Sequence, residues 1–133
     1  MFRHPLFLFS TALLFMLGVL HLLGILYSLY YFFRPLDLIA HFLGGAWVSL
    51  MVLWFFYFSG FVERRADIRE LLFVVFSAVL VLGLAWEVFE IAIGVPLEEG
   101  YVFDTLSDLF MDVAGAMVAV FFARWCYGNA EVR

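Results

Sequence analysis

The chain has 133 residues, of which 67% are hydrophobic and 14% are charged. A soluble domain carries about 45–50% apolar and about 25% charged residues, and so small a globule has too little interior to bury such an excess. The composition therefore excludes an ordinary soluble domain and predicts one all-α domain, residues 1–133, in a lipid bilayer. The net charge of −5 excludes nucleic acid as a partner, because proteins bind it through basic surfaces.

Four apolar stretches follow one another along the chain, at residues 6–33, 38–62, 71–93 and 106–127. Each contains the roughly 20 residues that a helix needs to cross about 30 Å of hydrocarbon. They predict a polytopic membrane protein with a four-transmembrane-helix bundle, because barrel strands are shorter and alternate in polarity. The first stretch exceeds the about 7–15 apolar residues of a signal peptide, so we expect a retained, tilted helix.

The positions of the arginines predict the orientation of the bundle. With four spans, the N-terminus, the second connection and the C-terminus lie on the same side of the membrane. Six of the seven arginines are on that side, and only Arg34 is on the other. Because arginine is enriched in cytoplasmic segments, we expect both termini in the cytoplasm of a multi-pass inner-membrane protein.

Six acidic residues lie inside an apolar stretch or at its edge, namely Asp37, Glu87, Glu90, Asp104, Asp108 and Asp112. An ionised side chain at the bilayer centre costs about 2.5–3.5 kcal/mol or more, so these groups must face the bundle interior or a wet cavity. Within each stretch they are three or four residues apart, and Asp37 is four residues before His41. This spacing places the side chains of a stretch on one helix face.

The expected topology brings these side chains to the extracytoplasmic half of the bundle. The second helix begins at that face, the third ends there and the fourth begins there. A rise of 1.5 Å per residue places His41, Glu90 and Asp108 at similar depth, with Glu87 and Asp112 deeper and the two remaining aspartates at the mouth. Small residues nearby would let the helices approach closely. They are Gly44, Gly45, Gly115 and Ala119.

So many carboxylates in one layer require either protonation or bound cations. Carboxylates combined with one imidazole suit zinc, manganese or iron, whereas magnesium prefers oxygen ligands alone. We expect a divalent metal site whose ligands come from Asp37, His41, Glu87, Glu90, Asp104, Asp108 and Asp112. Glu87 and Asp108 are also the candidate catalytic residues, and Arg34 is a candidate clamp for an anionic substrate group.

At these residues the chain resembles the YjdF-like and, more distantly, the VanZ-like small bacterial inner-membrane proteins. The shared pattern is Asp37-x-x-x-His41-Phe42, the pair Glu87 and Glu90, and Asp104-x-x-x-Asp108-x-x-x-Asp112-x-x-Gly115. VanZ-like proteins tend to have lysine, glutamine and asparagine where this chain has Leu38, Glu90 and Asp112, so the YjdF-like group is the more similar. The resemblance implies the architecture, and it carries no role in antibiotic resistance.

Three functions remain open at this point. A metal-dependent enzyme, a hydrolase or transferase, would act on a lipid-linked or amphipathic substrate. A non-catalytic subunit, in a homo-oligomer or a larger membrane complex, would hold a structural metal or a hydrogen-bonded acid cluster. A cation or proton transporter is the third, although the internal repeats common in carriers are not visible.

For several residues, a purely structural role is an alternative to a role in the predicted site. Asp37 and Asp104 could cap the second and fourth helices. Arg34 could anchor at the lipid headgroups by snorkelling. For His21, in the middle of the first stretch, a structural role is the favoured interpretation.

Overall fold

The computed structural model describes residues 4–62, 67–93 and 100–127. Within these ranges the chain is helical and contains no strand. The helices are α1 (Pro5–Leu26), α2 (Leu29–Phe32), α3 (Pro35–Tyr57), α4 (Ile68–Ala92) and α5 (Tyr101–Tyr127). All but α2 are long and apolar enough to cross a membrane. The predicted all-α fold with four membrane-spanning helices is confirmed.

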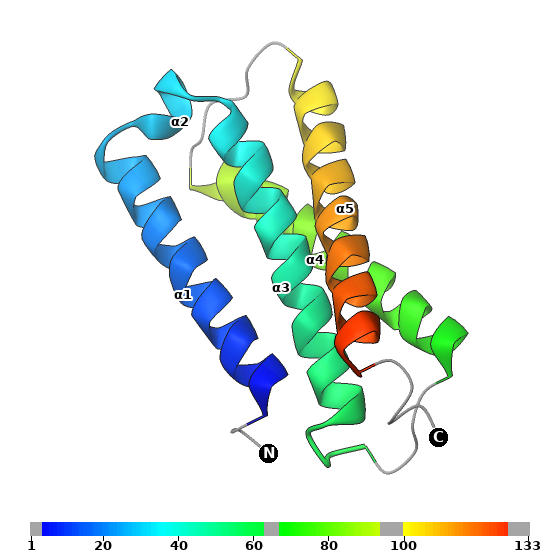
Figure 1. Cartoon of the computed structure of the whole chain (residues 1–133). Coiled ribbons are helices and arrows are strands. Elements are labelled where there is room, and N and C mark those ends of the chain that lie inside the picture. The colour runs from blue at the N-terminus through cyan, green and yellow to red at the C-terminus, as the bar shows by residue number, and fades with distance from the viewer. Residues whose placement is uncertain (1–3, 63–66, 94–99, 128–133) are drawn as a thin grey trace.

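Helix α3 is the centre of the bundle. It packs against α1, α4 and α5, and Figure 1 shows α1 and α5 flanking it while α4 runs obliquely behind. The start of α1 and the end of α5 lie at one end of the bundle, which we name the terminal end. The opposite end contains α2, the start of α3 and the start of α5, and we name it the acidic end.

Two glycines allow α3 and α5 to approach each other closely. A Cβ atom on Gly45 would overlap the backbone carbonyl of Asp112, and one on Gly115 would overlap the carbonyl of Phe42. Close backbone approach at small residues is a common way for helices to associate in membranes, where van der Waals packing supplies much of the attraction. The expectation of close approach is confirmed at these two positions. The contact fixes Asp112 beside the third turn of α3, one turn after His41.

The first apolar stretch differs from the single helix predicted over residues 6–33. Helix α1 ends at Leu26, and Ser28 adopts a left-handed conformation with φ of 52° before the short α2. The chain then turns back, so that the ring of Tyr30 lies against Gly24 and its hydroxyl is 2.9 Å from Nδ1 of His21. These contacts favour the fold-back over a longer, tilted helix.

The other three long helices begin three to five residues earlier than predicted. Pro35 occupies the first turn of α3 and Arg34 is its N-cap residue, so Asp37 lies inside the helix. Asp67 and Glu70 form a capping box that starts α4. Helix α5 begins at Tyr101, which places Asp104 in its first turn. Both aspartates therefore lie inside their helices, and the interpretation as N-cap residues is wrong for Asp37 and for Asp104.

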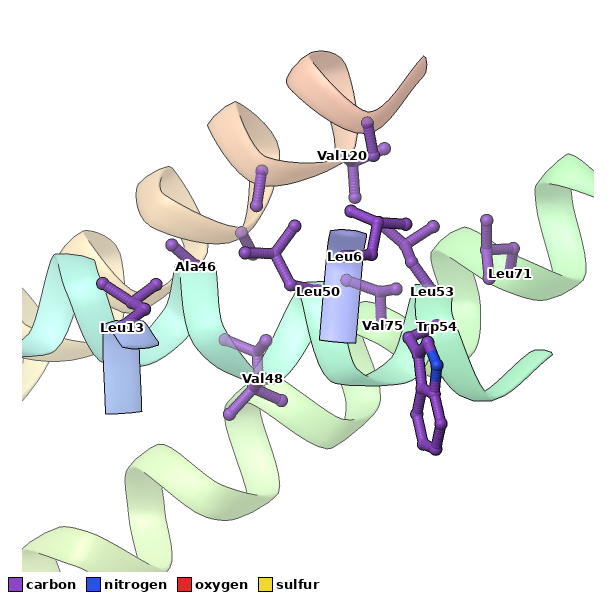
Figure 2. Packing of buried hydrophobic residues seen from close by; sticks show 14 residues of the cluster. Leu6, Leu13, Ala46, Val48, Leu50, Leu53, Trp54, Leu71, Val75 and Val120 are labelled. Atoms are coloured by element: carbon purple, nitrogen blue, oxygen red, sulfur yellow. The ribbon is translucent and has the colours of Figure 1, made fainter. Parts of the chain in front are cut away.

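Apolar side chains fill the interior between the helices, mainly toward the terminal end (Figure 2). Leu50 of α3 and Val75 of α4 are almost completely buried, and Ala116 of α5 has no exposed surface. Large apolar residues also cover the outside, such as Phe73 at 74% exposed and Phe121 at 71%. An outer surface of this kind suits the hydrocarbon of a bilayer. The chain is therefore built to face lipid on its outside.

Candidate functional site

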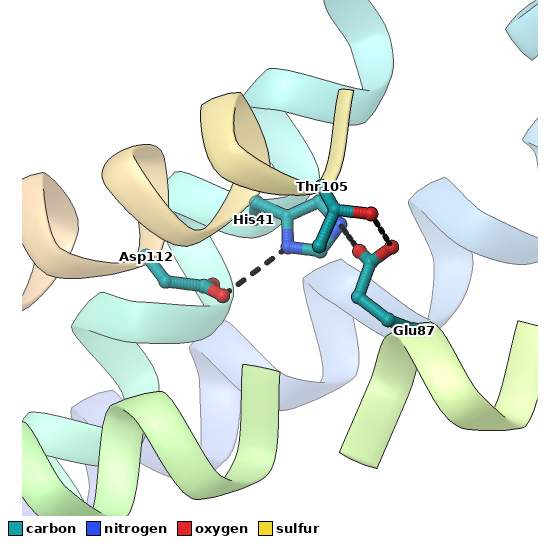
Figure 3. A network of polar contacts seen from close by, with 4 residues as sticks. All are labelled: His41, Glu87, Thr105 and Asp112. Carbon is teal, nitrogen blue, oxygen red and sulfur yellow. Dashed lines mark hydrogen bonds and ion pairs between the residues drawn. The ribbon is translucent and has the colours of Figure 1, made fainter. Parts of the chain in front are cut away.

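His41 is the centre of a polar cluster buried at the acidic end. Only 6% of the residue is exposed, and its two ring nitrogens face acids on two other helices. Nδ1 is 3.3 Å from Oδ2 of Asp112 on α5, and Nε2 is 3.8 Å from Oε1 of Glu87 on α4 (Figure 3). The imidazole thus links three helices.

Glu87 is held in place by a contact that the sequence did not suggest. The Thr105 hydroxyl of α5 donates a hydrogen bond of 2.9 Å to Oε2 of Glu87 (Figure 3). Glu87 is 5% exposed, so this bond satisfies one oxygen of a buried carboxylate and leaves the other directed at His41. Thr105 adjoins Asp104, and its single hydroxyl carried no periodic signal that could have identified it.

A second set of acids surrounds the same imidazole. Asp37, His41 and Asp108 each offer one ligand atom, and these three atoms lie within 4.8 Å of one another. Asp37 is one turn before His41 on α3, and Asp108 is one turn before Asp112 on α5. Around zinc, bonds of about 2.0–2.2 Å keep ligand atoms roughly 3–4 Å apart. Small side-chain adjustments would bring this set to bonding distance.

Three buried polar atoms of the cluster have no hydrogen-bond partner among the described residues. They are Nε2 of His41, Oε1 of Glu87 and Oδ1 of Asp108. A buried polar atom without a partner costs about 1–3 kcal/mol, and more when it is charged. Asp108 and His41 are more than nine-tenths buried, so bulk water does not satisfy them. The arrangement has the capacity to bind a cation at this point.

The contacts of Nδ1 set the chemistry of the imidazole. An ionised Asp112 would accept a hydrogen bond from Nδ1, and the neutral tautomer with its proton on Nδ1 fits this contact. In the neutral ring Nε2 then has a free lone pair. Histidines that bind metals almost always donate the other ring N–H to a carboxylate or carbonyl in this way. His41 is therefore oriented for Nε2 to act as a ligand.

The remaining predicted site residues lie farther from this centre. Asp104 and Arg34 are exposed at the acidic end, and Glu90 is half-buried near Tyr30 and Asp37. In the structure His41 contacts the two acids that the depth estimate put below it, Glu87 and Asp112. The estimate assumed parallel helices, whereas α4 crosses α3 obliquely. Metal ligation by Asp104 and Glu90 and substrate binding by Arg34 stay predictions.

A cavity of about 380 Å³ lies beside the cluster, between α1, α3 and α4. Asp37, His41 and Asp112 contribute its polar wall. Its other walls are mainly apolar, from Leu14 and Leu17 of α1 to Val79 and Leu82 of α4. Pockets for small molecules usually measure about 300–1,000 Å³ and are largely apolar with a few polar groups. This cavity has both features.

Tyr30, His21 and Trp86 line the same cavity, and His21 contacts both of the others. The ring centroids of His21 and Trp86 are 5.2 Å apart, edge to face. Burial, reinforced by the nearby charges of Asp37 and Glu90, raises the pKa of Tyr30 to about 12. The phenol is therefore neutral and remains a hydrogen-bond partner for Nδ1 of His21. This contact supports the structural role favoured for His21.

Comparison with known proteins places the chain in a family. No curated protein and no solved structure matches it. A family model described as "Predicted membrane protein (DUF2238)" matches residues 1–129. That match covers nearly the whole chain and agrees with the four membrane-spanning helices. The chain belongs to this family of predicted membrane proteins.

Proposed function

We propose that this protein binds one divalent metal ion through Asp37, His41 and Asp108 and uses it in a hydrolysis or transfer reaction on an amphipathic substrate. The observation that carries the proposal is the convergence of three ligand atoms within 4.8 Å. Two of these residues also have a buried polar atom without a partner. A cation at this point would satisfy both atoms and balance the surrounding carboxylates.

The donor set favours particular metals. One imidazole nitrogen and two carboxylate oxygens suit zinc, manganese(II) or iron(II) better than magnesium, which prefers oxygen alone. Catalytic zinc sites commonly have three protein ligands and leave a further position for water or substrate. The proposed set has that number of ligands. Asp112 would hold the His41 ring in orientation without contacting the metal.

Glu87 is the proposed general base. Its free oxygen, Oε1, is 3.8 Å from Nε2 of His41, and the hydrogen bond from Thr105 fixes the carboxylate in this position. A bound metal would supply a water of lowered pKa and polarise the substrate oxygen. Glu87 would then accept the proton of that water. Arg34, three residues before Asp37, would bind an anionic group of the substrate.

The proposal also includes the relationship to the YjdF-like proteins and the orientation of the protein in the membrane. The family match and the motif pattern support a kinship with the YjdF-like proteins. The arginine distribution supports a multi-pass protein of the inner membrane with cytoplasmic termini. In that orientation the acidic end faces the extracytoplasmic side.

Metal analysis of purified protein tests the proposal. Wild-type protein, purified without chelator and loaded with zinc or manganese, should contain about one equivalent of metal per chain. His41→Ala and Asp108→Asn should each reduce this content at least about tenfold, because a three-ligand site loses a ligand. The measurement is elemental analysis after removal of free metal.

Asp104→Asn is the matched control. It removes the same chemical group from the same helix, one turn away, at an exposed position. The proposed ligand set leaves Asp104 out, so the metal content of this variant should equal that of the wild type; a loss as large as in the site variants would instead support the ligation by Asp104 that the sequence predicts. Equal metal content in the wild type and both site variants, with all proteins folded, would contradict the proposal.

A further inference from the structure

The cavity beside the polar cluster lies between two membrane-spanning helices that do not pack together. Among the described residues, no Cα atom of α1 comes within 8 Å of one in α4. The two helices are instead bridged by side chains near the acidic end, where His21 contacts Trp86. Both helices pack on α3, so the cavity has α3 as its back wall.

The open side of the cavity faces the bilayer. Leu14 of α1 and Leu82 of α4 line the cavity, yet they are 46% and 49% exposed. Gly18 also lines it, and a Cβ atom added there would meet no atom within 4 Å. All three residues lie within spans long enough to cross the membrane. The surroundings of this opening are therefore hydrocarbon, and the apolar residues that line this part of the cavity suit an apolar molecule.

At the acidic end of the bundle, side-chain contacts between α1, α2 and α4 close the cavity. The hydrogen bond between Tyr30 and His21, with the Tyr30 ring against Gly24, holds α2 over the end of α1. Trp86 lies against His21 at the same level. An apolar ligand therefore has its path between α1 and α4, and only its polar part would reach the wall formed by Asp37, His41 and Asp112.

We propose that this cavity binds one hydrocarbon chain of a membrane lipid, which enters sideways between α1 and α4 and brings its polar end to His41. A lipid matches both the apolar and the polar wall of the cavity, because its hydrocarbon chain is apolar and its other end is polar. The binding of the lipid's hydrocarbon chain is inferred from the cavity alone. The further step, that the bound lipid is the substrate, rests on the function proposed above.

Photolabelling in vesicles tests this proposal. The protein is reconstituted in phosphatidylethanolamine that includes a fraction with a diazirine on one acyl chain, then irradiated and analysed by peptide mass spectrometry. Labels should be enriched on the cavity residues Gly18, Gly44 and Leu82 relative to the outward-facing Phe121. Gly18→Leu and Leu82→Trp, which add bulk at the opening, should each reduce cavity labelling at least about fivefold.

Two controls separate this proposal from the proposed function. Phe121→Trp, on the outer face, should leave cavity labelling unchanged. Asp108→Asn, at a residue that does not line the cavity, should also leave the labelling of the cavity near the wild-type level, whatever its metal content. Labelling of the cavity no stronger than that of the outer face, or unchanged by both bulky substitutions in folded protein, would overturn the proposal while leaving the metal site intact.

Discussion

The terminal end and the acidic end of the bundle are built from the same four helices but differ in what they bury. The terminal end packs apolar side chains from all four, including Leu6, Leu53, Leu71 and Ala123. The acidic end buries His41, Glu87, Asp108 and Asp112 beside a cavity. Buried polar groups in a membrane protein are costly and usually functional. The comparison indicates that one end supplies stability and that the other end holds the candidate site.

The largest effect is expected where the two ends join, at the α3–α5 contact. Gly115→Leu would force a side chain into the backbone of Phe42, which cannot move aside without separating the helices. We expect a loss of about 3 kcal/mol or more in the free energy of unfolding, the upper range for overpacking. Equilibrium unfolding by sodium dodecyl sulfate measures it. Gly18→Leu, which enters open space, should cost less than about 0.5 kcal/mol.

A pair of substitutions compares the two ends directly. Leu50→Ala removes a side chain that is 2% exposed in the apolar core, and it should cost about 2–4 kcal/mol. Glu87→Gln, in metal-depleted protein, should stabilise the fold by about 1 kcal/mol. It removes a buried carboxylate charge whose Oε1 has no hydrogen-bond partner, but keeps an oxygen to accept the Thr105 hydrogen bond. A loss of stability in Glu87→Gln as large as that in Leu50→Ala would contradict the division between the two ends.

A small loss of stability is expected at Tyr30, on the edge of the acidic end. Tyr30→Phe removes the hydrogen bond to His21 and should cost about 1 kcal/mol. Because burial raises the pKa of Tyr30 above its ordinary value of 10.0 to about 12, ionisation favours the unfolded chain. The contribution of the phenol is therefore complete below pH 10 and is lost as the pH rises through 12.

Ultraviolet titration of the folded protein checks this assignment. The difference between wild type and Tyr30→Phe should show one phenol that titrates near pH 12. A difference spectrum that titrates near pH 10 would place Tyr30 in water instead of against α1.

Much of this division between an apolar end and a polar end could be predicted from the sequence, because the hydrophobicity and charge of each segment are set by its own residues. The runs of apolar residues predicted the four membrane spans. The high free energy of a charged group in lipid predicted an interior position for the polar residues of the spans, and four of them are buried: His41, Glu87, Asp108 and Asp112. The break at Ser28 could not be predicted in this way. No glycine or proline interrupts residues 25–33, and the fold-back depends on contacts of Tyr30 with His21 and Gly24 in α1.

The grouping within the site also depended on tertiary geometry. Axial counting along each helix gave the correct end of the bundle and correctly grouped His41 with Asp108. It put Glu90 instead of Glu87 beside His41, because α4 crosses α3 at an angle. The cavity beside the site was not predicted either. The cavity exists because α1 and α4 lie apart from each other. No sequence pattern within either helix indicates how far apart the two helices lie.

The central claim, that side chains from different helices share one cation through His41, is tested most directly by pulsed electron paramagnetic resonance of the manganese(II)-loaded protein. We expect one bound manganese ion per chain, with hyperfine coupling to a single imidazole nitrogen that disappears in His41→Gln. Bound manganese without nitrogen coupling, or coupling that persists in His41→Gln, would contradict it.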